Sequence, residues 1–165
     1  MTTTETAVGT HTYTIYVDAT PEAIWDAITD GEQTVRYGYA CPVEYDLRPG
    51  GAFAVRASAP MREQGMSDVI IDGEVIEADA PHKLVQTWNP LFGPPVTEEP
   101  STRLTYEIKP VENGGTKVMV THDLDGAPMT AGLVTGEVEM GGGGWAFLLS
   151  DLKTLLETGK SFAGS

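Results

Sequence analysis

The feature that most constrains the fold of this chain is its one long amphipathic helical segment, which follows a long series of alternating segments. An apolar stripe near the C-terminus has the helical spacing i, i+3, i+4, i+7, i+10 and i+11. Gly159 is expected to end this helix. The glycines at 141–144 disfavour helix before it by about 1 kcal/mol each, so we expect a break or flexible entry there. The stripe consists of Trp145, Leu148, Leu149, Leu152, Leu155 and Leu156.

Most of the preceding chain alternates between apolar and polar residues, which is the pattern of half-buried β-strands. In residues 11–18, for example, Tyr13 and Val17 lie on the same side. An Asn-Gly step at 113–114 predicts a hairpin between the last two strands. After the first strand, we expect strands at residues 43–48, 52–57, 69–77, 83–88, 101–109 and 116–124.

One or two short helices are expected after the first strand. Thr20 is the expected N-cap and Pro21 the first-turn residue of a helix that ends at residues 30–31. Residues 32–39 are a candidate second helix, whereas residues 60–68 and 89–100 are expected to be loops. The small, polar residues 1–10 are expected to form a flexible tail, which leaves a single domain over residues 11–162.

This order of elements predicts an α+β fold in which a long helix covers an antiparallel sheet. Because the strands alternate, the sheet should have one wet face and one dry face. A helix is about 10 Å across, so one helix is too narrow to cover the dry face alone. Either large side chains close the remaining gap, or a cavity remains between the helix and the sheet.

Charge and composition exclude several classes of function. The 165 residues include 10 Lys and Arg against 24 Asp and Glu, which gives a formal net charge of −14. Such an acidic surface repels nucleic acid and anionic lipid. No apolar stretch reaches the roughly 20 residues needed to cross a membrane, and no signal peptide is visible. Cys41 is the single cysteine, which excludes an internal disulfide framework. We expect a cytoplasmic protein that is a monomer or a homodimer.

Several short segments in order carry a family resemblance. They are residues 19–30, 48–53, 73–77, 83–88, 115–118, 121–123, 144–145 and 149–159. Together they make residues 11–162 resemble a START-like (SRPBCC, birch-pollen-allergen-type) domain. More narrowly, the chain is similar to the family named after the activator of the heat-shock-protein-90 ATPase.

The resemblance implies a helix-grip fold, in which a curved antiparallel sheet wraps around the C-terminal helix and leaves a cavity between them. It does not define the activity, because the superfamily includes lipid carriers, hormone receptors, polyketide cyclases and aromatases. Chaperone stimulation belongs to the eukaryotic founder of the narrower family, which has a further domain that we expect this chain to lack.

The most interesting titratable residue is His122, which alternation places on the inward face. It could act as an acid–base catalyst or hydrogen-bond a ligand, or it could be a core histidine bonded to a neighbour. Gln86 lies on the same face and needs partners, either from the protein or from a ligand. Tyr106 and Trp88 are favoured for orienting an apolar ligand through their polar tips. The remaining predicted ligand-binding residues are Tyr37, Phe53, Val55, Leu104, Val120, Trp145 and Leu149; Trp25, Tyr39 and Tyr45 are further aromatic candidates.

No pattern indicates a metal or a cofactor. His122 and Asp123 are neighbours on a strand and point to opposite faces, and no known metal-ligand spacing is present. Cys41 is expected to be a small buried residue. Glu98 and Glu99 are expected to be a solvated pair in a loop. Asp151 and Glu157 are expected on the solvent-exposed side of the last helix.

Three functions remain open at this point. The first is binding of an apolar or aromatic small molecule in the cavity, oriented by His122, Gln86 or a tyrosine hydroxyl. The alternative is a cyclase-type or lyase-type enzyme that uses the same cavity, with His122 as the acid–base group. A third is a module that stimulates a chaperone ATPase. We place binding ahead of catalysis.

Overall fold

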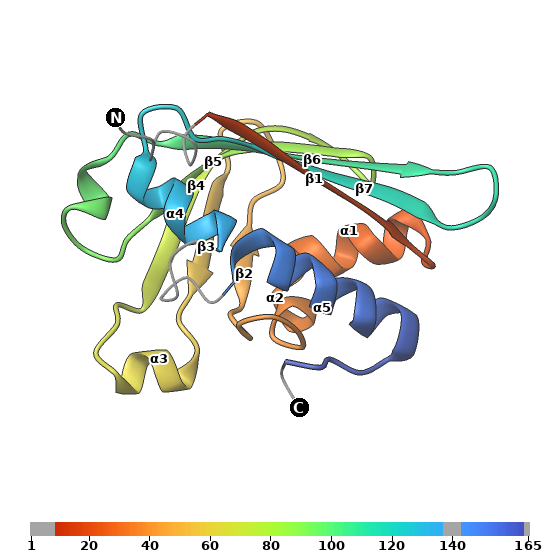
Figure 1. The fold of residues 1–165 in the computed structure, drawn as a ribbon, viewed down its shortest axis with the longest axis horizontal. Helices are drawn as coiled ribbons and strands as arrows, with labels where there is room; N and C mark the ends of the chain where they lie inside the picture. The colour runs from red at the N-terminus through yellow and green to blue at the C-terminus, as the bar shows by residue number, and fades with distance from the viewer. Residues whose placement is uncertain (1–8, 137–142, 164–165) are drawn as a thin grey trace.

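The computed structural model describes residues 9–136 and 143–163, and it contains a seven-stranded sheet. The strands follow the order β1-β7-β6-β5-β4-β3-β2, and all neighbouring pairs are antiparallel. The sheet curves, so that β2 and β3 turn toward the helices (Figure 1). The strands are β1 (Thr10–Val17), β2 (Val43–Tyr45), β3 (Ala52–Arg56), β4 (Val69–Asp79), β5 (Lys83–Pro90), β6 (Thr102–Pro110) and β7 (Thr116–Asp123).

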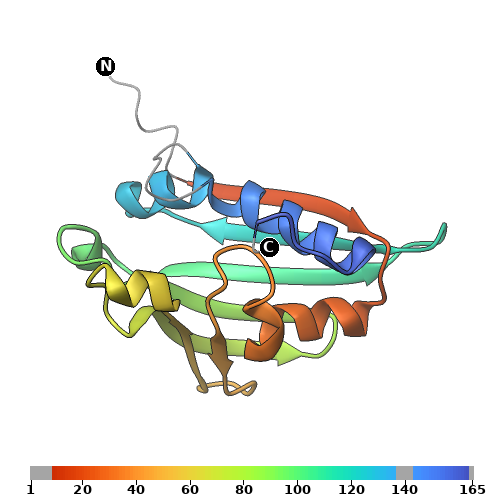
Figure 2. The same ribbon diagram turned by 90° about the horizontal axis from the view of Figure 1, so that it is seen from below.

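The helices gather on one face of this sheet, where α5 and α1 lie over the strands (Figure 2). The predicted α+β helix-grip fold, with a curved antiparallel sheet around a long C-terminal helix, is confirmed. The helices are α1 (Pro21–Thr29), α2 (Gly31–Thr34), α3 (Ala59–Glu63), the 3-10 turn η2 (Val96–Glu98), α4 (Pro128–Thr135) and α5 (Gly144–Thr158).

Local signals explain where the two main helices begin and end. The Thr20 side chain accepts a hydrogen bond from the Ala23 N–H at 3.1 Å, as expected of an N-cap. Gly159 ends α5 in the left-handed conformation. α5 begins at Gly144, where a Cβ atom would lie 2.1 Å from the Val134 carbonyl oxygen, so only glycine fits this contact. Of the predicted break at 141–144, residues 141 and 142 lie outside the described residues.

Of the predictions about the short segments, one was wrong and one was right about the presence of a helix but not about its length. α3 lies where residues 60–68 were expected to form a loop, because Ser58 caps the Met61 N–H and Pro60 occupies the first turn. The predicted second helix at 32–39 ends already at Thr34. Residues 35–42 form a loop instead, which we call the wall loop.

α4 was not predicted at all, because its N-terminal cap comes from a distant segment. Its N-cap residue, Ala127, has no side-chain oxygen. The Glu99 carboxylate instead accepts hydrogen bonds from the backbone N–H groups of Met129 at 2.8 Å and Thr130 at 2.9 Å. Glu99 was expected to be solvated; it is in fact partly buried, and its charge stabilises a helix N-terminus.

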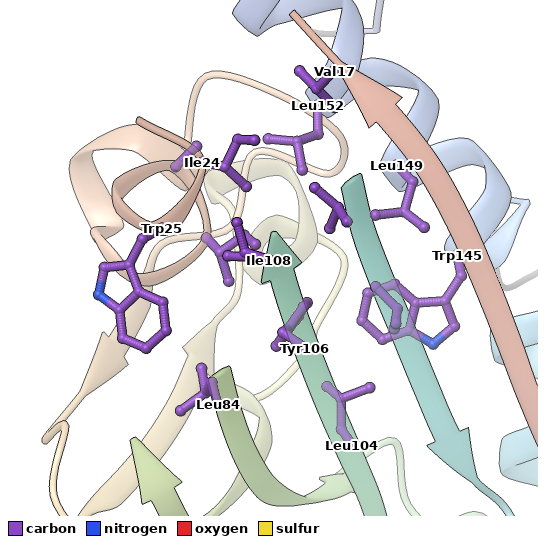
Figure 3. Packing of buried hydrophobic residues seen from close by; sticks show 14 of the residues in the cluster. Val17, Ile24, Trp25, Leu84, Leu104, Tyr106, Ile108, Trp145, Leu149 and Leu152 are labelled. Carbon is purple, nitrogen blue, oxygen red and sulfur yellow. The ribbon is translucent and has the colours of Figure 1, made fainter. Parts of the chain in front are cut away.

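The core fills one end of the space between the helices and the sheet. Ile108 pairs with Val118 and Tyr106 with Val120 in the register of β6 and β7. Leu149 and Leu152 project from α5 onto this face, opposite Ile24 from α1 (Figure 3). We call this region the closed end; its residues are Val17, Ile24, Ile108, Val118, Val120, Leu149, Leu152 and Leu155, none more than 5% exposed.

Candidate functional site

The other end of the same space holds a cavity of about 800 Å³, which is within the range of small-molecule sites. Its walls come from β2 to β6, the wall loop, the first turns of α5, and the segments around α3 and α4. The lining residues are Ile28, Thr34, Tyr37, Tyr39, Cys41, Val43, Tyr45, Phe53, Val55, Met61, Gln64, Gly65, Met66, Ser67, Ile70, Ile71, Trp88, Leu91, Phe92, Gly93, Tyr106, Leu133, Val134, Gly144, Trp145 and Leu148.

The lining is aromatic and uncharged. It includes eight aromatic side chains, and no Asp, Glu, Lys, Arg or His is among the described residues that line it. Moving a charge from water into such surroundings is costly unless the charge is paired. The cavity therefore favours an uncharged ligand, even though the chain as a whole carries a net charge of −14.

His122 is fully buried behind the wall of this cavity and does not line it. The Trp145 indole N–H, which can only donate, gives a hydrogen bond to Nδ1 of His122 at 3.0 Å. A neutral imidazole then carries its proton on Nε2, which donates to the Thr102 hydroxyl at 2.8 Å. That hydroxyl donates in turn to the Trp88 carbonyl oxygen at 2.8 Å. Both ring nitrogens of His122 are thus used, and they link two aromatic residues of the wall.

Burial, with a smaller contribution from the neighbouring His11, lowers the pKa of His122 from 6.5 to about 3. The imidazole is therefore neutral at physiological pH, in the tautomer that the network requires. Of the two interpretations that the sequence left open, this geometry matches a core histidine bonded to its neighbours.

Gln86 is also fully buried and lies outside the lining. Its Oε1 accepts a hydrogen bond from the Tyr45 hydroxyl at 2.6 Å, and its Nε2 donates to the Thr87 carbonyl oxygen at 3.3 Å. Gln86 thus has its hydrogen-bond partners within the protein, and its bond to the Tyr45 hydroxyl holds that tyrosine in the cavity wall.

The structure brings together about half of the predicted ligand-binding set. Tyr37, Phe53, Val55, Trp88, Tyr106 and Trp145 line the cavity. Gln86, Leu104, Val120, His122 and Leu149 are buried outside it. Gln86, Leu104, Val120 and His122 come from strands of the sheet and Leu149 from α5, and each of them is at most 3% exposed. That any of these residues contacts a ligand stays a prediction.

The sequence analysis missed the residues near the short helices. Met61 and Met66 come from α3 and the segment after it, Leu91 and Phe92 from the connection after β5, and Leu133 from α4. These segments were expected to be loops or were given no structure. The alternating pattern that located Tyr106 and Trp88 does not extend into them.

Cys41 lines the cavity but has the environment of a structural residue. It is 9% exposed, and its Sγ lies 3.5 Å from the Tyr39 carbonyl oxygen and 3.6 Å from the Met61 sulfur. Burial raises the pKa of the Cys41 thiol, so the thiol stays protonated. The predicted small buried residue matches this placement.

Asp151 ties the wall loop to the end of the chain. It was expected on the wet side of α5, but it is fully buried, which corrects that expectation. Its Oδ2 accepts hydrogen bonds from the Gly38 N–H at 2.8 Å and the Ser161 hydroxyl at 2.6 Å, and its Oδ1 accepts one from the Phe162 N–H at 2.8 Å. Burial raises the pKa of Asp151, but these hydrogen bonds lower it more, so the carboxylate stays ionised.

Neither a metal centre nor a membrane span is found in residues 9–136 and 143–163. They contain no group of three or more His, Cys, Asp or Glu side chains placed to hold a metal ion. None of the helices in these ranges has the length and hydrophobicity needed to cross a bilayer.

A curved antiparallel sheet that grips one long helix, with an apolar cavity between them, defines a START-like (SRPBCC) protein. Within that superfamily, the sequence model of the family described as "Activator of Hsp90 ATPase homolog 1-like protein" matches residues 18–157, and the chain belongs to this family. None of the curated proteins compared with the chain matches it.

Solved structures share the fold at low sequence identity. CalU16 from Micromonospora echinospora is 21% identical, with a TM-score of 0.63 over 94% of this chain and 78% of that one. An HSP90 activator from Plasmodium falciparum, PFC0360w, is 22% identical, with a TM-score of 0.62 over 90% and 96%. DynU16, a protein in the dynemicin biosynthetic locus, is 20% identical, with a TM-score of 0.67 over 93% of this chain and 49% of that one. Identities this low show the fold alone.

Proposed function

We propose that this protein binds an uncharged apolar or aromatic small molecule in the cavity between the sheet and α5. The observation that carries the proposal is a cavity of about 800 Å³ whose described lining is aromatic and without charge. Its wall side chains pack into two apolar clusters, one that includes Tyr37, Tyr106 and Trp145 and one that includes Cys41 and Ile70, which supports a site largely formed before a ligand arrives.

The geometry supports binding over the cyclase or lyase alternative. General acid–base catalysis needs a titratable group within hydrogen-bond reach of the substrate. His122 has both nitrogens in hydrogen bonds to the protein and lies behind the wall. The cavity tyrosines are also unsuited as bases, because burial raises the pKa of Tyr37 and Tyr106 above the ordinary 10.0.

Chaperone stimulation rests only on the family description and on one similar structure, so we do not propose it. The HSP90 activator from Plasmodium falciparum shares the fold with this chain at 22% identity. No described surface of this chain gives that function separate support.

Binding of fluorene, a neutral planar hydrocarbon, tests the proposal. We expect fluorene to raise the melting temperature and to form a complex of one ligand per chain in native mass spectrometry. At a concentration 100 times its dissociation constant, a ligand stabilises the folded state by about 2.7 kcal/mol. Palmitate, whose carboxylate would have to enter the uncharged cavity, should bind less tightly.

Two valine variants make the test specific to the cavity. Val55→Trp adds a ring to the lining and should abolish the fluorene-induced shift. Val35→Trp makes the same change at an exposed position outside the lining and should leave the shift intact. The proposal fails if fluorene neither stabilises the wild-type protein nor appears in its mass spectrum.

A further inference from the structure

Three tyrosine hydroxyl groups gather in the cavity, whose other polar lining side chains are Thr34, Tyr39, Gln64 and Ser67. Tyr37 lies in the wall loop, Tyr45 in β2 and Tyr106 in β6, and all three line the cavity. Their hydroxyl groups lie close enough to interact electrostatically, Tyr106 with both others and Tyr37 with Tyr45. Segments far apart in the sequence thus bring three hydroxyl groups to one region of the cavity.

Two of these hydroxyl protons already have acceptors. Tyr37 donates to the Ala27 carbonyl oxygen at 2.8 Å. Tyr45 donates to Gln86 Oε1 at 2.6 Å. Both tyrosines are therefore held by the protein itself, and neither proton is available to a ligand.

The Tyr106 hydroxyl differs from the other two. No residue in the described part of the chain forms a hydrogen bond with it, although the Tyr106 side chain is 92% buried, since only 8% of the residue is exposed. Every described side-chain nitrogen or oxygen that is fully shielded from solvent does have a partner. The Tyr106 oxygen is therefore reachable from the cavity. Its ring is held edge-to-face against Trp145, with centroids 6.1 Å apart.

We infer that Tyr106 determines the specificity of this cavity, and that its ligands are neutral aromatic molecules with a carbonyl oxygen, such as aryl ketones or lactones. The inference rests on the proposed function and names the ligand class. A carbonyl oxygen only accepts hydrogen bonds, so it complements the one proton of these three hydroxyl groups that the protein leaves uncommitted. A hydrocarbon of the same shape would displace water from Tyr106 and leave its O–H without an acceptor, which is unfavourable.

The same observations exclude a carboxylate or a phosphate as the recognised group. No Lys, Arg or His is among the described lining residues, so an anion would be buried without a counter-charge. Tyr106 itself stays neutral, because burial raises its pKa. The aromatic rings of the wall fit a planar ring system, and the Tyr106 hydroxyl sets its orientation.

The inference is tested with 9-fluorenone and fluorene, two planar tricyclic molecules that differ by the carbonyl group. Dissociation constants are measured by isothermal titration calorimetry for the wild-type protein and for Tyr106→Phe. We expect the wild-type protein to bind 9-fluorenone about tenfold more tightly than fluorene, as one hydrogen bond would give. Tyr106→Phe should bind fluorene as before and lose the preference for the ketone.

Tyr37→Phe is the matched control within the same cluster. Its hydroxyl proton is committed to Ala27, so removing it should leave the preference for 9-fluorenone in place. If wild-type protein binds both molecules equally, or if Tyr106→Phe keeps the preference, the assignment to Tyr106 is overturned while the proposed function stands. If neither molecule binds to the wild-type protein, both are overturned.

A spectroscopic readout needs no variant. The carbonyl stretching band of 9-fluorenone bound to the wild-type protein should lie at lower frequency than in an alkane solvent, because a hydrogen bond weakens the C=O bond. An unshifted band would show a ketone without a donor and would overturn the assignment.

Discussion

The closed end and the cavity lie between the same sheet and the same helix, yet one is packed solid and the other is hollow. Leu149 and Leu152 from α5 meet Ile24 from α1 at the closed end. Trp145 and Leu148, on the same helix, face the cavity. The difference lies in what stands beside α5. The closed end has the nine-residue α1, whereas the five-residue α3 and the eight-residue α4 border the cavity. A single apolar stripe therefore borders both a packed core and a cavity, depending on which elements lie next to it.

The largest expected effect contrasts two leucines of α5. Leu152→Ala removes a side chain that is 2% exposed at the closed end and should lower the free energy of unfolding by about 2–5 kcal/mol. Leu148→Ala makes the same change at the cavity wall, where the side chain is only half-buried, and should cost about 1 kcal/mol. Urea unfolding of both variants measures the difference. Equal losses would show that the two regions are packed alike.

A second effect concerns pH, through the histidine at the boundary of the two regions. The folded-state pKa of His122 is about 3 against an ordinary 6.5, so below pH 6.5 the unfolded chain binds a proton that the folded chain does not. The stability from this group is present above about pH 6.5 and falls as the pH drops toward 3, by about 1.4 kcal/mol per pH unit. Urea unfolding at pH 7, 6 and 5 should show this fall.

His122→Gln separates this contribution from the carboxylates. A glutamine does not titrate, so the stability of this variant should change less between pH 7 and 5 than that of the wild-type protein. Asp151 has a lowered pKa, so its contribution is lost only as the pH falls below its ordinary 3.8. Parallel pH profiles for the two proteins would contradict the buried, neutral His122.

The smallest expected effect concerns the wall of the cavity formed by α4. Glu99→Gln removes the charge that caps this helix and should cost about 0.5–1 kcal/mol. The loss should appear as faster hydrogen exchange of α4 amides, with the closed end unaffected. Glu98→Gln is the matched control, because Glu98 makes no such cap in the described residues. Equal exchange in both variants would remove the role assigned to Glu99.

The fold could be predicted from the sequence where the signals are local. Thr20 and Pro21 define the start of α1 by side-chain and backbone chemistry within one turn. The alternation of residues around Tyr106 and Val120 fixes which face of the sheet is dry. α4 was missed because its cap, Glu99, is about 30 positions upstream in the chain. No window of neighbouring residues contains that contact.

The candidate site was only partly predictable, for a different physical reason. Alternation gives the face of a strand on which a residue lies, but not whether a helix covers that position. Tyr106 and Leu104 are two positions apart on one face, yet Tyr106 lines the cavity and Leu104 is fully buried outside it. The environment of His122 likewise depends on Trp145, which arrives from another element.

The hydrogen bonds of Asp151 have a practical consequence for handling the protein. Ser161 and Phe162 supply two of the three donors to this buried carboxylate, and Gly38 in the wall loop supplies the third. A chain truncated after Gly159 would leave a negative charge half-solvated beside the loop that carries Tyr37 and Tyr39. Affinity tags and fusion partners therefore belong at the opposite terminus, since trimming or extending the segment after Gly159 would remove or strain hydrogen bonds that hold Asp151 beside the wall loop.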